Sequence, residues 1–264
     1  MKESYQRLCA GLSALKLEAM RMSLDGVIDR VNSGETSFVD GLETLVSRQV
    51  EEARRRRTDC IIAQAHLPSR KTFGEFDFGF QPELNKKEVM DLETLRFMEA
   101  KENVLFVGLP GVGKTHLAIA TGVAAAESGK TVYFISCHEL LSNLKKAKAE
   151  NRLEHRLRHY SSYSLLIIDE VGYLPVDSEA ADLMFELIAR RYEKKSTIVT
   201  TNKALGKWGE MFGDAMVANA MLDRLLHCRV PNYFIKVFAN CFMKKSADCT
   251  TYMQKVPLAR NFFD

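Results

Sequence analysis

The stretch that decides the fold is Gly108-Leu109-Pro110-Gly111-Val112-Gly113-Lys114-Thr115. Its spacing of Gly, four residues and Gly-Lys-Thr is typical of a turn whose backbone N–H groups surround a β-phosphate. Lys114 is expected to reach the β- and γ-phosphates, and the Thr115 hydroxyl is expected to ligate magnesium. Residues 104–107 are typical of a buried strand entering the loop, and residues 115–128 of the helix leaving it. The sequence therefore predicts a nucleotide-binding loop in an α/β protein.

A second apolar strand, predicted at 165–168, ends in two carboxylates, Asp169 and Glu170. Ligands bind at the carboxyl ends of strands in open α/β sheets. We expect Asp169 to hold magnesium together with Thr115. Glu170 is the candidate to orient and deprotonate an attacking water. Taken alone, the same residues could be two solvated carboxylates after a strand.

Two further polar residues are candidates for catalysis. Asn202 follows another apolar strand, where its amide could sense the γ-phosphate or position the water; an ordinary turn residue is the alternative. Arg224 stands among apolar residues of a predicted helix and could act as a finger on a neighbouring subunit's γ-phosphate. A salt bridge from Arg224 to Asp223 or Glu210 is the alternative.

The chain has three zones. Residues 1–67 have helical periodicity, and the helix after Ser37 is expected to bury a face consisting of Leu42, Leu45, Val46 and Val50. Residues 68–102 form an aromatic-rich linker followed by a short helix around 88–100. Residues 103–264 alternate strands and helices, which predicts a parallel sheet with helices on both faces. The remaining strand candidates are 132–135 and 197–200.

Composition is ordinary for a globular protein, with 46% apolar and 27% charged residues in 264. No run of 18 apolar residues and no signal peptide is evident, so neither a membrane partner nor export is expected. The six cysteines are scattered, which favours reduced thiols in the cytoplasm.

Charge is distributed unevenly along the chain. Residues 229–264 carry six basic and two acidic side chains, so the rest is close to neutral and net charge is no argument for DNA binding. The one local cluster is Arg54-Arg55-Arg56-Arg57, which is predicted to contact DNA phosphates. A solvated basic helix end is the alternative.

In this order, the motifs resemble the AAA+ ATPases of the IstB type, which are ATP-binding helper proteins of bacterial insertion sequences and relatives of the DnaC helicase loaders. The resemblance runs from about residue 12 to about residue 227 and is carried by residues 113–118, 168–175, 190–193, 201–203, 208–210, 212–214 and 222–227.

The resemblance implies the following roles. Lys114 and Thr115 bind the phosphates of ATP and magnesium, and Asp169 and Glu170 are the acidic pair. Asn202 is the first nucleotide sensor, and Arg224 is a finger acting in trans. The resemblance also implies a bacterial cytoplasmic homo-oligomer on double-stranded DNA that recruits or activates a transposase, with the helical N-terminal domain contacting DNA.

The resemblance ends near Cys228. Similar proteins continue into a last strand and a Ser-Tyr-Arg-like stretch whose Arg is a second sensor, whereas residues 229–264 depart from that pattern. Residues 233–238 have the pattern to supply the missing strand. Our hypothesis for this change is a frameshifted or decayed reading frame.

Two other functions use the same loop. A helicase loader shares the ATPase core but grips a replicative helicase. A small-molecule kinase is disfavoured, because Asp169-Glu170, Asn202 and Arg224 suit water activation and hydrolysis coupled between subunits.

Overall fold

The computed structural model describes residues 2–81, 84–173, 176–226 and 234–236, and the chain forms two compact units, 1–60 and 61–264. The limits of the three zones inferred above remain predictions. Among the residues described, no helix combines the length and apolar character that a membrane span requires.

The first unit is helical. It contains α1 (Lys2–Ala14), α2 (Glu18–Asn32) and most of α3 (Phe38–Gln64), around a small core of Leu12, Leu24, Val27 and Leu45. The helix N-terminus expected at Ser37 is present, because the Ser37 hydroxyl accepts a hydrogen bond from the Asp40 N–H at 3.2 Å.

The expected buried face of α3 is wrong in part. Leu45 is buried, but Leu42, Val46 and Val50 are 45%, 46% and 61% exposed. The reason lies at Gly41, where an added Cβ would stand 2.9 Å from Cγ1 of Val27. This close approach turns the Gly41–Leu45 side of α3 toward α2, which leaves the i, i+4 stripe of Leu42, Val46 and Val50 uncovered.

The second unit is built on a parallel sheet, as the sequence predicts. Its order is β2-β3-β4-β1-β5, and all four neighbouring pairs are parallel. The strands are β1 (Val104–Val107), β2 (Val132–Ser136), β3 (Leu165–Val171), β4 (Ser196–Thr201) and β5 (Phe234–Lys236). β5 falls within the 233–238 segment and pairs with β1, in register Leu105 to Phe234.

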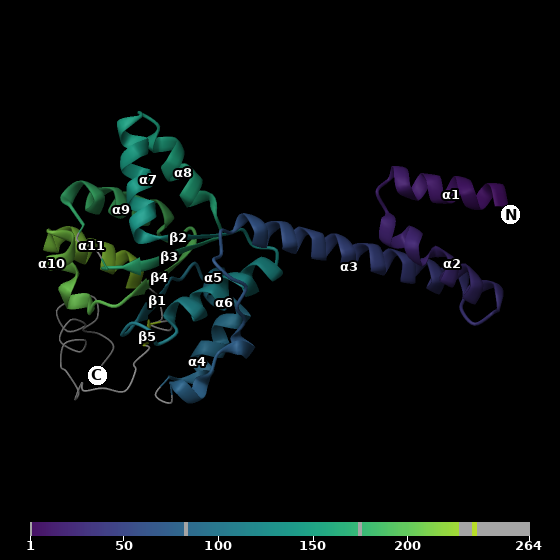
Figure 1. Cartoon of the computed structure of the whole chain (residues 1–264), viewed down its shortest axis with the longest axis horizontal. Coiled ribbons are helices and arrows are strands. Elements are labelled where there is room, and N and C mark those ends of the chain that lie inside the picture. The colour runs from purple at the N-terminus through teal and green to yellow at the C-terminus, as the bar shows by residue number, and fades with distance from the viewer. Residues whose placement is uncertain (1, 82–83, 174–175, 227–233, 237–264) are drawn as a thin grey trace. The chain divides into compact units, whose positions relative to one another are not determined.

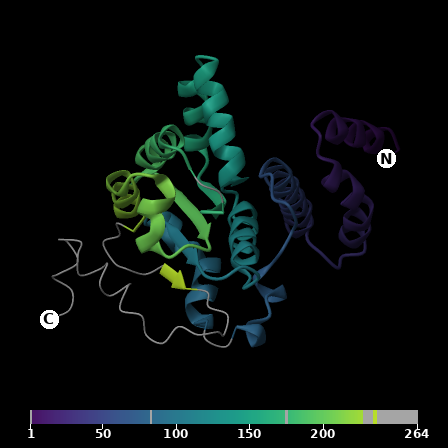
Figure 2. The same cartoon turned by 60° about the vertical axis from the view of Figure 1, so that its left-hand side comes forward.

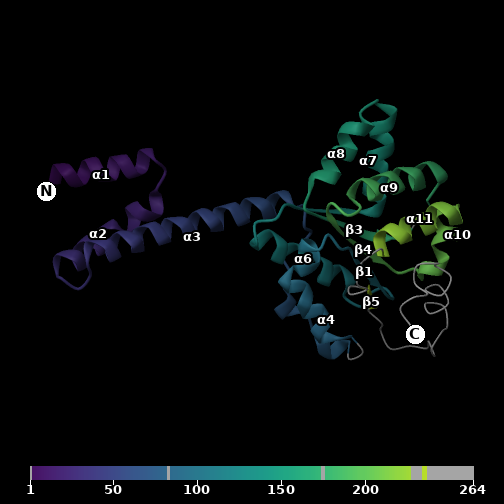
Figure 3. The same ribbon diagram turned by 180° about the vertical axis from the view of Figure 1, so that it is seen from behind.

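Helices cover both faces of this sheet (Figure 1, Figure 3). Because strand residues alternate between faces, Val104 and Phe106 belong to one core and Leu105 to the other. The first core also contains residues of α4 (Lys86–Asp91), α5 (Arg96–Glu99) and α6 (Lys114–Glu127). The second contains residues of α7 (Cys137–Ala149), α8 (Leu153–Ser162), α9 (Ser178–Arg191), α10 (Trp208–Phe212) and α11 (Ala215–Leu226).

The helix expected around 88–100 is interrupted. α4 is followed by a 3-10 turn (Leu92–Thr94), and Leu95, at φ 59°, separates this turn from α5. The break allows three side chains to be buried in the core that α6 shares: Leu92, Leu95 and Phe97. Core packing therefore favours two short helical segments over one continuous helix. Three more 3-10 turns occur at Phe73–Glu75, Phe78–Phe80 and Leu205–Lys207.

Candidate nucleotide-binding site

The glycine-rich loop joins the end of β1 to the start of α6. Gly111 and Gly113 have φ values of 81° and 91°, a backbone conformation that L side chains rarely adopt. A Cβ on Gly113 would also lie 2.6 Å from Cε2 of Phe76. The N–H of Gly108 donates to the Thr201 carbonyl at 3.2 Å, which fixes the start of the loop against β4.

Lys114 is held over this loop. Its side chain is buried, and Nζ donates to the carbonyl oxygens of Gly108 at 2.9 Å and Leu109 at 2.8 Å. Burial lowers the pKa of Lys114, while Asp169 and Glu170 act to raise it. Because its nearest hydrogen-bond acceptors are neutral carbonyls, the ammonium is free to exchange them for phosphate oxygens.

Thr115 and Asp169 meet at the carboxyl edge of the sheet. Oγ1 of Thr115 lies 3.0 and 3.2 Å from the two carboxylate oxygens of Asp169. The hydroxyl of Thr200, from β4, donates to Asp169 Oδ1 at 2.5 Å. Hydroxyl and carboxylate oxygens are the ligands that magnesium prefers, so this oxygen set fits that ion. No cluster of three or more His, Cys, Asp or Glu suited to another metal is found in the described part of the chain.

Glu170 occupies an unusual backbone position. Its φ is 61°, and among the described non-glycine residues with positive φ it alone lies in a strand. The register between β3 and β4 shifts between Ile168 and Val171, and the Glu170 N–H donates to Thr200 Oγ1 at 2.9 Å. Such irregularities re-aim side chains next to active sites. Glu170 is accordingly exposed, whereas its neighbour Asp169 is buried.

Asn202 follows β4 directly, at the same edge of the sheet as Asp169. Its Oδ1 is buried and has no hydrogen-bond partner among the described residues. A buried amide oxygen without a donor is costly, so this atom is available to a water or ligand group.

The main chain of Arg224 lies at the amino end of β1, the end opposite to the phosphate-binding loop. Asn103, which precedes β1, donates from Nδ2 to the carbonyls of Arg224 and Leu225 at 3.2 and 3.3 Å. From Asn103 to Gly108 the extended chain rises roughly 16 Å. The structure thus brings Lys114, Thr115, Asp169, Glu170 and Asn202 to the carboxyl end of the sheet, and it ties the main chain at Arg224 to the opposite end of β1.

Three residues of this arrangement were not singled out from the sequence. Phe76 packs against the loop glycine Gly113. The Thr200 hydroxyl is hydrogen-bonded to the Asp169 carboxylate and to the Glu170 N–H. Asn103, just before β1, is hydrogen-bonded to the end of α11 and accepts from the Thr197 N–H at 2.9 Å. Only Thr200 had a sequence indication, because it stands at the end of the strand before Asn202.

The remaining candidates lie outside this site. Arg54–Arg57 are exposed on α3 in the first unit, and Arg56 pairs with Glu52 at 2.8 Å. The rest of the 227–264 tail, apart from β5, lies outside the described residues.

The parallel sheet, its loop and the acidic strand end define a P-loop nucleotide-binding protein of the AAA+ type. Residues 10–245 match the family described as IstB-like ATP-binding protein. The chain belongs to this family. The match continues beyond Cys228, so the family pattern extends further than the motifs alone indicate.

Curated relatives are ATP-binding proteins of insertion sequences. The chain is 50% identical over 227 residues to that of IS232 from Bacillus thuringiensis subsp. berliner, covering 86% of this chain and 91% of the relative. It is 45% identical over 216 residues to that of IS21 from Pseudomonas aeruginosa, covering 82% of each.

Solved structures support the fold. The replication initiator DnaA bound to AMPPCP and single-stranded DNA superposes with a TM-score of 0.54 at 18% identity, covering 74% of this chain and 60% of that one. DnaI superposes with a TM-score of 0.51 at 17% identity, covering 65% and 92%.

Proposed function

We propose that this protein is a magnesium-dependent ATPase that assembles as a homo-oligomer on double-stranded DNA and assists a transposase. The observation that carries the proposal of ATP hydrolysis is a pair of hydrogen bonds, from the hydroxyls of Thr115 and Thr200 to Asp169. They hold the acidic end of β3 against the phosphate-binding loop. Membership of a family of insertion-sequence ATP-binding proteins supports the rest.

Each residue of the site has a distinct part in hydrolysis. Lys114 exchanges its two carbonyl partners for β- and γ-phosphate oxygens. Thr115 and Asp169 hold magnesium, which when bound neutralises charge on the phosphates. Glu170 accepts the proton of the attacking water, and the Asn202 amide, whose Oδ1 lacks a partner among the described residues, positions that water.

The place of Arg224 supports assembly. Its main chain lies at the amino end of β1, opposite to the loop at the carboxyl end, which favours the loop of a neighbouring subunit as the target of a finger. Exposed apolar side chains on α1, α2 and α3 also support association, because monomers rarely expose many of them together.

DNA binding in this proposal involves Arg54–Arg57. All four are exposed, and of these only Arg56 has an ion pair within the described structure. Counterion release makes such contacts favourable on duplex DNA. The names of the relatives, which place them in insertion sequences, support a transposase as the protein partner.

Two substitutions test nucleotide binding and ATP hydrolysis at this site. Lys114→Ala should abolish nucleotide binding, because the loop loses its cation, whereas Lys130→Ala, at an exposed turn, should leave binding intact. Glu170→Gln should bind ATP normally but hydrolyse it slowly, because an amide cannot accept the proton.

Nucleotide titration and phosphate release measure these two effects. Unchanged affinity in Lys114→Ala would remove the loop from nucleotide binding. Wild-type hydrolysis in Glu170→Gln would remove Glu170 from its role.

A further inference from the structure

A buried glutamine amide without partners lies in the segment that packs on the phosphate-binding loop. Gln81 is 2% exposed, and neither its Nε2 nor its Oε1 has a hydrogen-bond partner within the residues that the structure describes. An unpaired polar group in the interior costs free energy, and here both the donor and the acceptor of one amide are unpaired. Such a side chain indicates a ligand group that supplies the missing partners.

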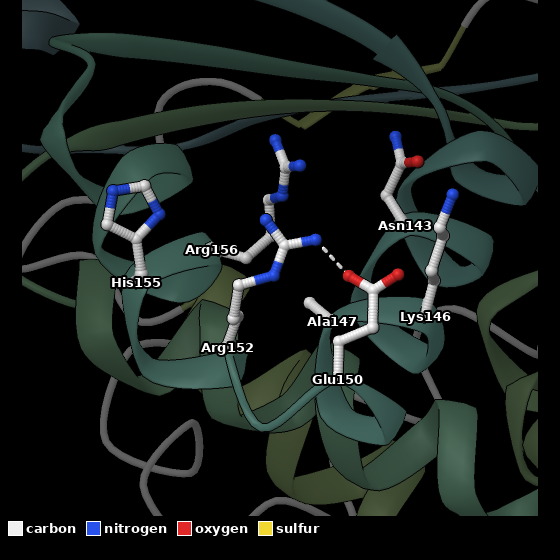
Figure 4. A pocket seen from close by; sticks show the side chains of 7 residues that line it. All are labelled: Asn143, Lys146, Ala147, Glu150, Arg152, His155 and Arg156. Carbon is white, nitrogen blue, oxygen red and sulfur yellow. Dashed lines mark hydrogen bonds and ion pairs between the residues drawn. The ribbon is translucent and has the colours of Figure 1, made fainter.

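The polar side chains of a hollow between α7 and α8 differ from Gln81 (Figure 4). Most of them are exposed, so water can supply their partners: Lys146, Glu150, Arg152 and His155. Arg152 also pairs with Glu150, as the dashed line marks. In the described part of the chain, Gln81 has neither solvent nor a neighbouring side chain to pair with.

The segment that carries Gln81 packs against the phosphate-binding loop and α6. It joins α3 to β1, is drawn in blue in Figure 2, and contacts α6. Nε2 of His116, at the start of α6, lies 3.0 Å from the carbonyl oxygen of Thr72. The ring centres of Phe76 and His116 are 5.4 Å apart, and a Cβ on Gly113 would lie 2.6 Å from Cε2 of Phe76. This part of the segment is therefore fixed beside the residues that are expected to bind phosphate.

Gln81 lies one aromatic ring further from the loop. The rings of Phe76, which contacts the loop, and Phe78 have centres 4.9 Å apart. The Gln81 N–H donates to the Phe78 carbonyl at 3.1 Å, which closes the 3-10 turn Phe78–Phe80. A nucleotide whose phosphates occupy the loop extends its ribose and base beyond it, and Gln81 is placed to meet the base.

The chemistry of the amide favours an uncharged partner with both a donor and an acceptor. Phe76 and Phe78 pack against the first core, so the surroundings are apolar. A phosphate offers only acceptors and would leave Oε1 unpaired, whereas a cation would leave Nε2 unpaired. Adenine offers its 6-amino group as a donor and an adjacent ring nitrogen as an acceptor, and a glutamine amide can pair with both at once.

We infer that Gln81 is a specificity-determining residue that binds the adenine base of ATP. Its Oε1 accepts from the 6-amino group, and its Nε2 donates to the adjacent ring nitrogen. The inference rests on the proposed function, because it requires the loop to bind the phosphates of ATP, and it adds the residue that selects the base. A purine without the 6-amino group leaves Oε1 unpaired and is therefore rejected.

The test compares ATP with purine riboside triphosphate, which lacks only the 6-amino group, by titration of the full chain. We expect the wild type to bind ATP about tenfold more tightly. Gln81→Met keeps the length of the side chain and removes the amide, so it should bind the two nucleotides equally. Its free energy of unfolding without nucleotide should not decrease, because an unpaired amide has been removed from the interior.

Gln49→Met is the matched control. Oε1 of Gln49 accepts from the N–H groups of Ala19 and Met20 at 3.1 and 3.3 Å, so this variant should lose stability and keep the preference for ATP. Gln81→Leu repeats the comparison with a side chain of another shape, so that a packing defect in one variant does not decide the result.

Equal affinity of the wild type for the two nucleotides would overturn the inference, and so would a wild-type preference for ATP in either Gln81 variant. Loss of stability in both variants would also overturn it, because the amide would then have a partner inside the protein. Wild-type protein that bound neither nucleotide would defeat the proposed function as well, whereas ATP binding without a preference would leave that function standing.

Discussion

Arg224 is weakly tied to its own chain. Its Nη1 donates to the Ala220 carbonyl at 2.8 Å, and its guanidinium lies 4.5 Å from the centre of the Phe185 ring. The salt bridges to Asp223 or Glu210 that the sequence left open are not among the ion pairs of the described residues. Arg224→Ala should therefore cost only about 0.5–1 kcal/mol of stability.

Hydrolysis should respond very differently to that substitution. If Arg224 acts on the next subunit, Arg224→Ala should lower the rate by roughly 10³–10⁵ while a single subunit still binds ATP. Mixing Arg224→Ala with Glu170→Gln subunits should restore activity, because some interfaces then join an intact Glu170 to an intact Arg224. No rescue in oligomers shown to be mixed would leave Arg224 with a structural role.

Arg191 is a buried cation that the sequence did not distinguish from its neighbour. Its guanidinium donates to the carbonyls of Tyr160 at 2.9 Å, Tyr163 at 3.0 Å and Ser196 at 2.5 Å, and to the Thr197 hydroxyl at 2.9 Å. It thereby joins the ends of α8 and α9 to the start of β4. Arg191→Met should lower the free energy of unfolding by at least about 2 kcal/mol, because several buried acceptors lose their donor.

Arg190→Met is the control for this prediction. Arg190 is partly exposed and pairs with Glu154 and Glu186, so its loss should cost at most about 1 kcal/mol. Denaturant unfolding measures both variants. Equal losses would mean that the buried hydrogen bonds of Arg191 contribute no more than a surface ion pair.

At the scale of elements, the sequence predicted the strands and loops whose residue pattern lies within a few consecutive positions. Four apolar strands, the loop glycines and the polar strand ends are each visible within a few residues, so the succession of these elements along the chain follows from the sequence. The turn at Leu95 and the rotation of α3 at Gly41 could not be predicted, because each depends on a partner distant in sequence. For the same reason, the sequence could not predict that Phe76 packs against Gly113 or that Asn103 is hydrogen-bonded to the end of α11.

The basic segment of α3 supplies a prediction at this scale. Replacing Arg54–Arg57 with Gln should weaken duplex binding and flatten its salt dependence by about 0.9 for each phosphate that is no longer neutralised. Arg30→Gln, an exposed change on α2, gives the reference for removing a single charge. An unchanged slope in the Arg54–Arg57 variant would place the DNA surface elsewhere.

At the scale of the whole molecule, the helical unit and the ATPase unit have different parts in the proposed function. The first carries Arg54–Arg57 and an uncovered apolar stripe, and the second carries the nucleotide site. DNA-dependent hydrolysis requires DNA binding and ATP hydrolysis to be coupled. Such coupling must appear as an effect of DNA on the rate of ATP hydrolysis. The frameshift hypothesis concerns residues largely outside the described structure, and activity of the full chain bears on it directly.

The most direct measurement is therefore ATP hydrolysis by the full 264-residue chain, with and without duplex DNA, beside Glu170→Gln under the same conditions. We expect phosphate release by the wild type that increases when duplex DNA is added, and almost none by Glu170→Gln in either case. Phosphate release equal to that of Glu170→Gln, or a wild-type rate that duplex DNA leaves unchanged, would contradict a DNA-dependent ATPase.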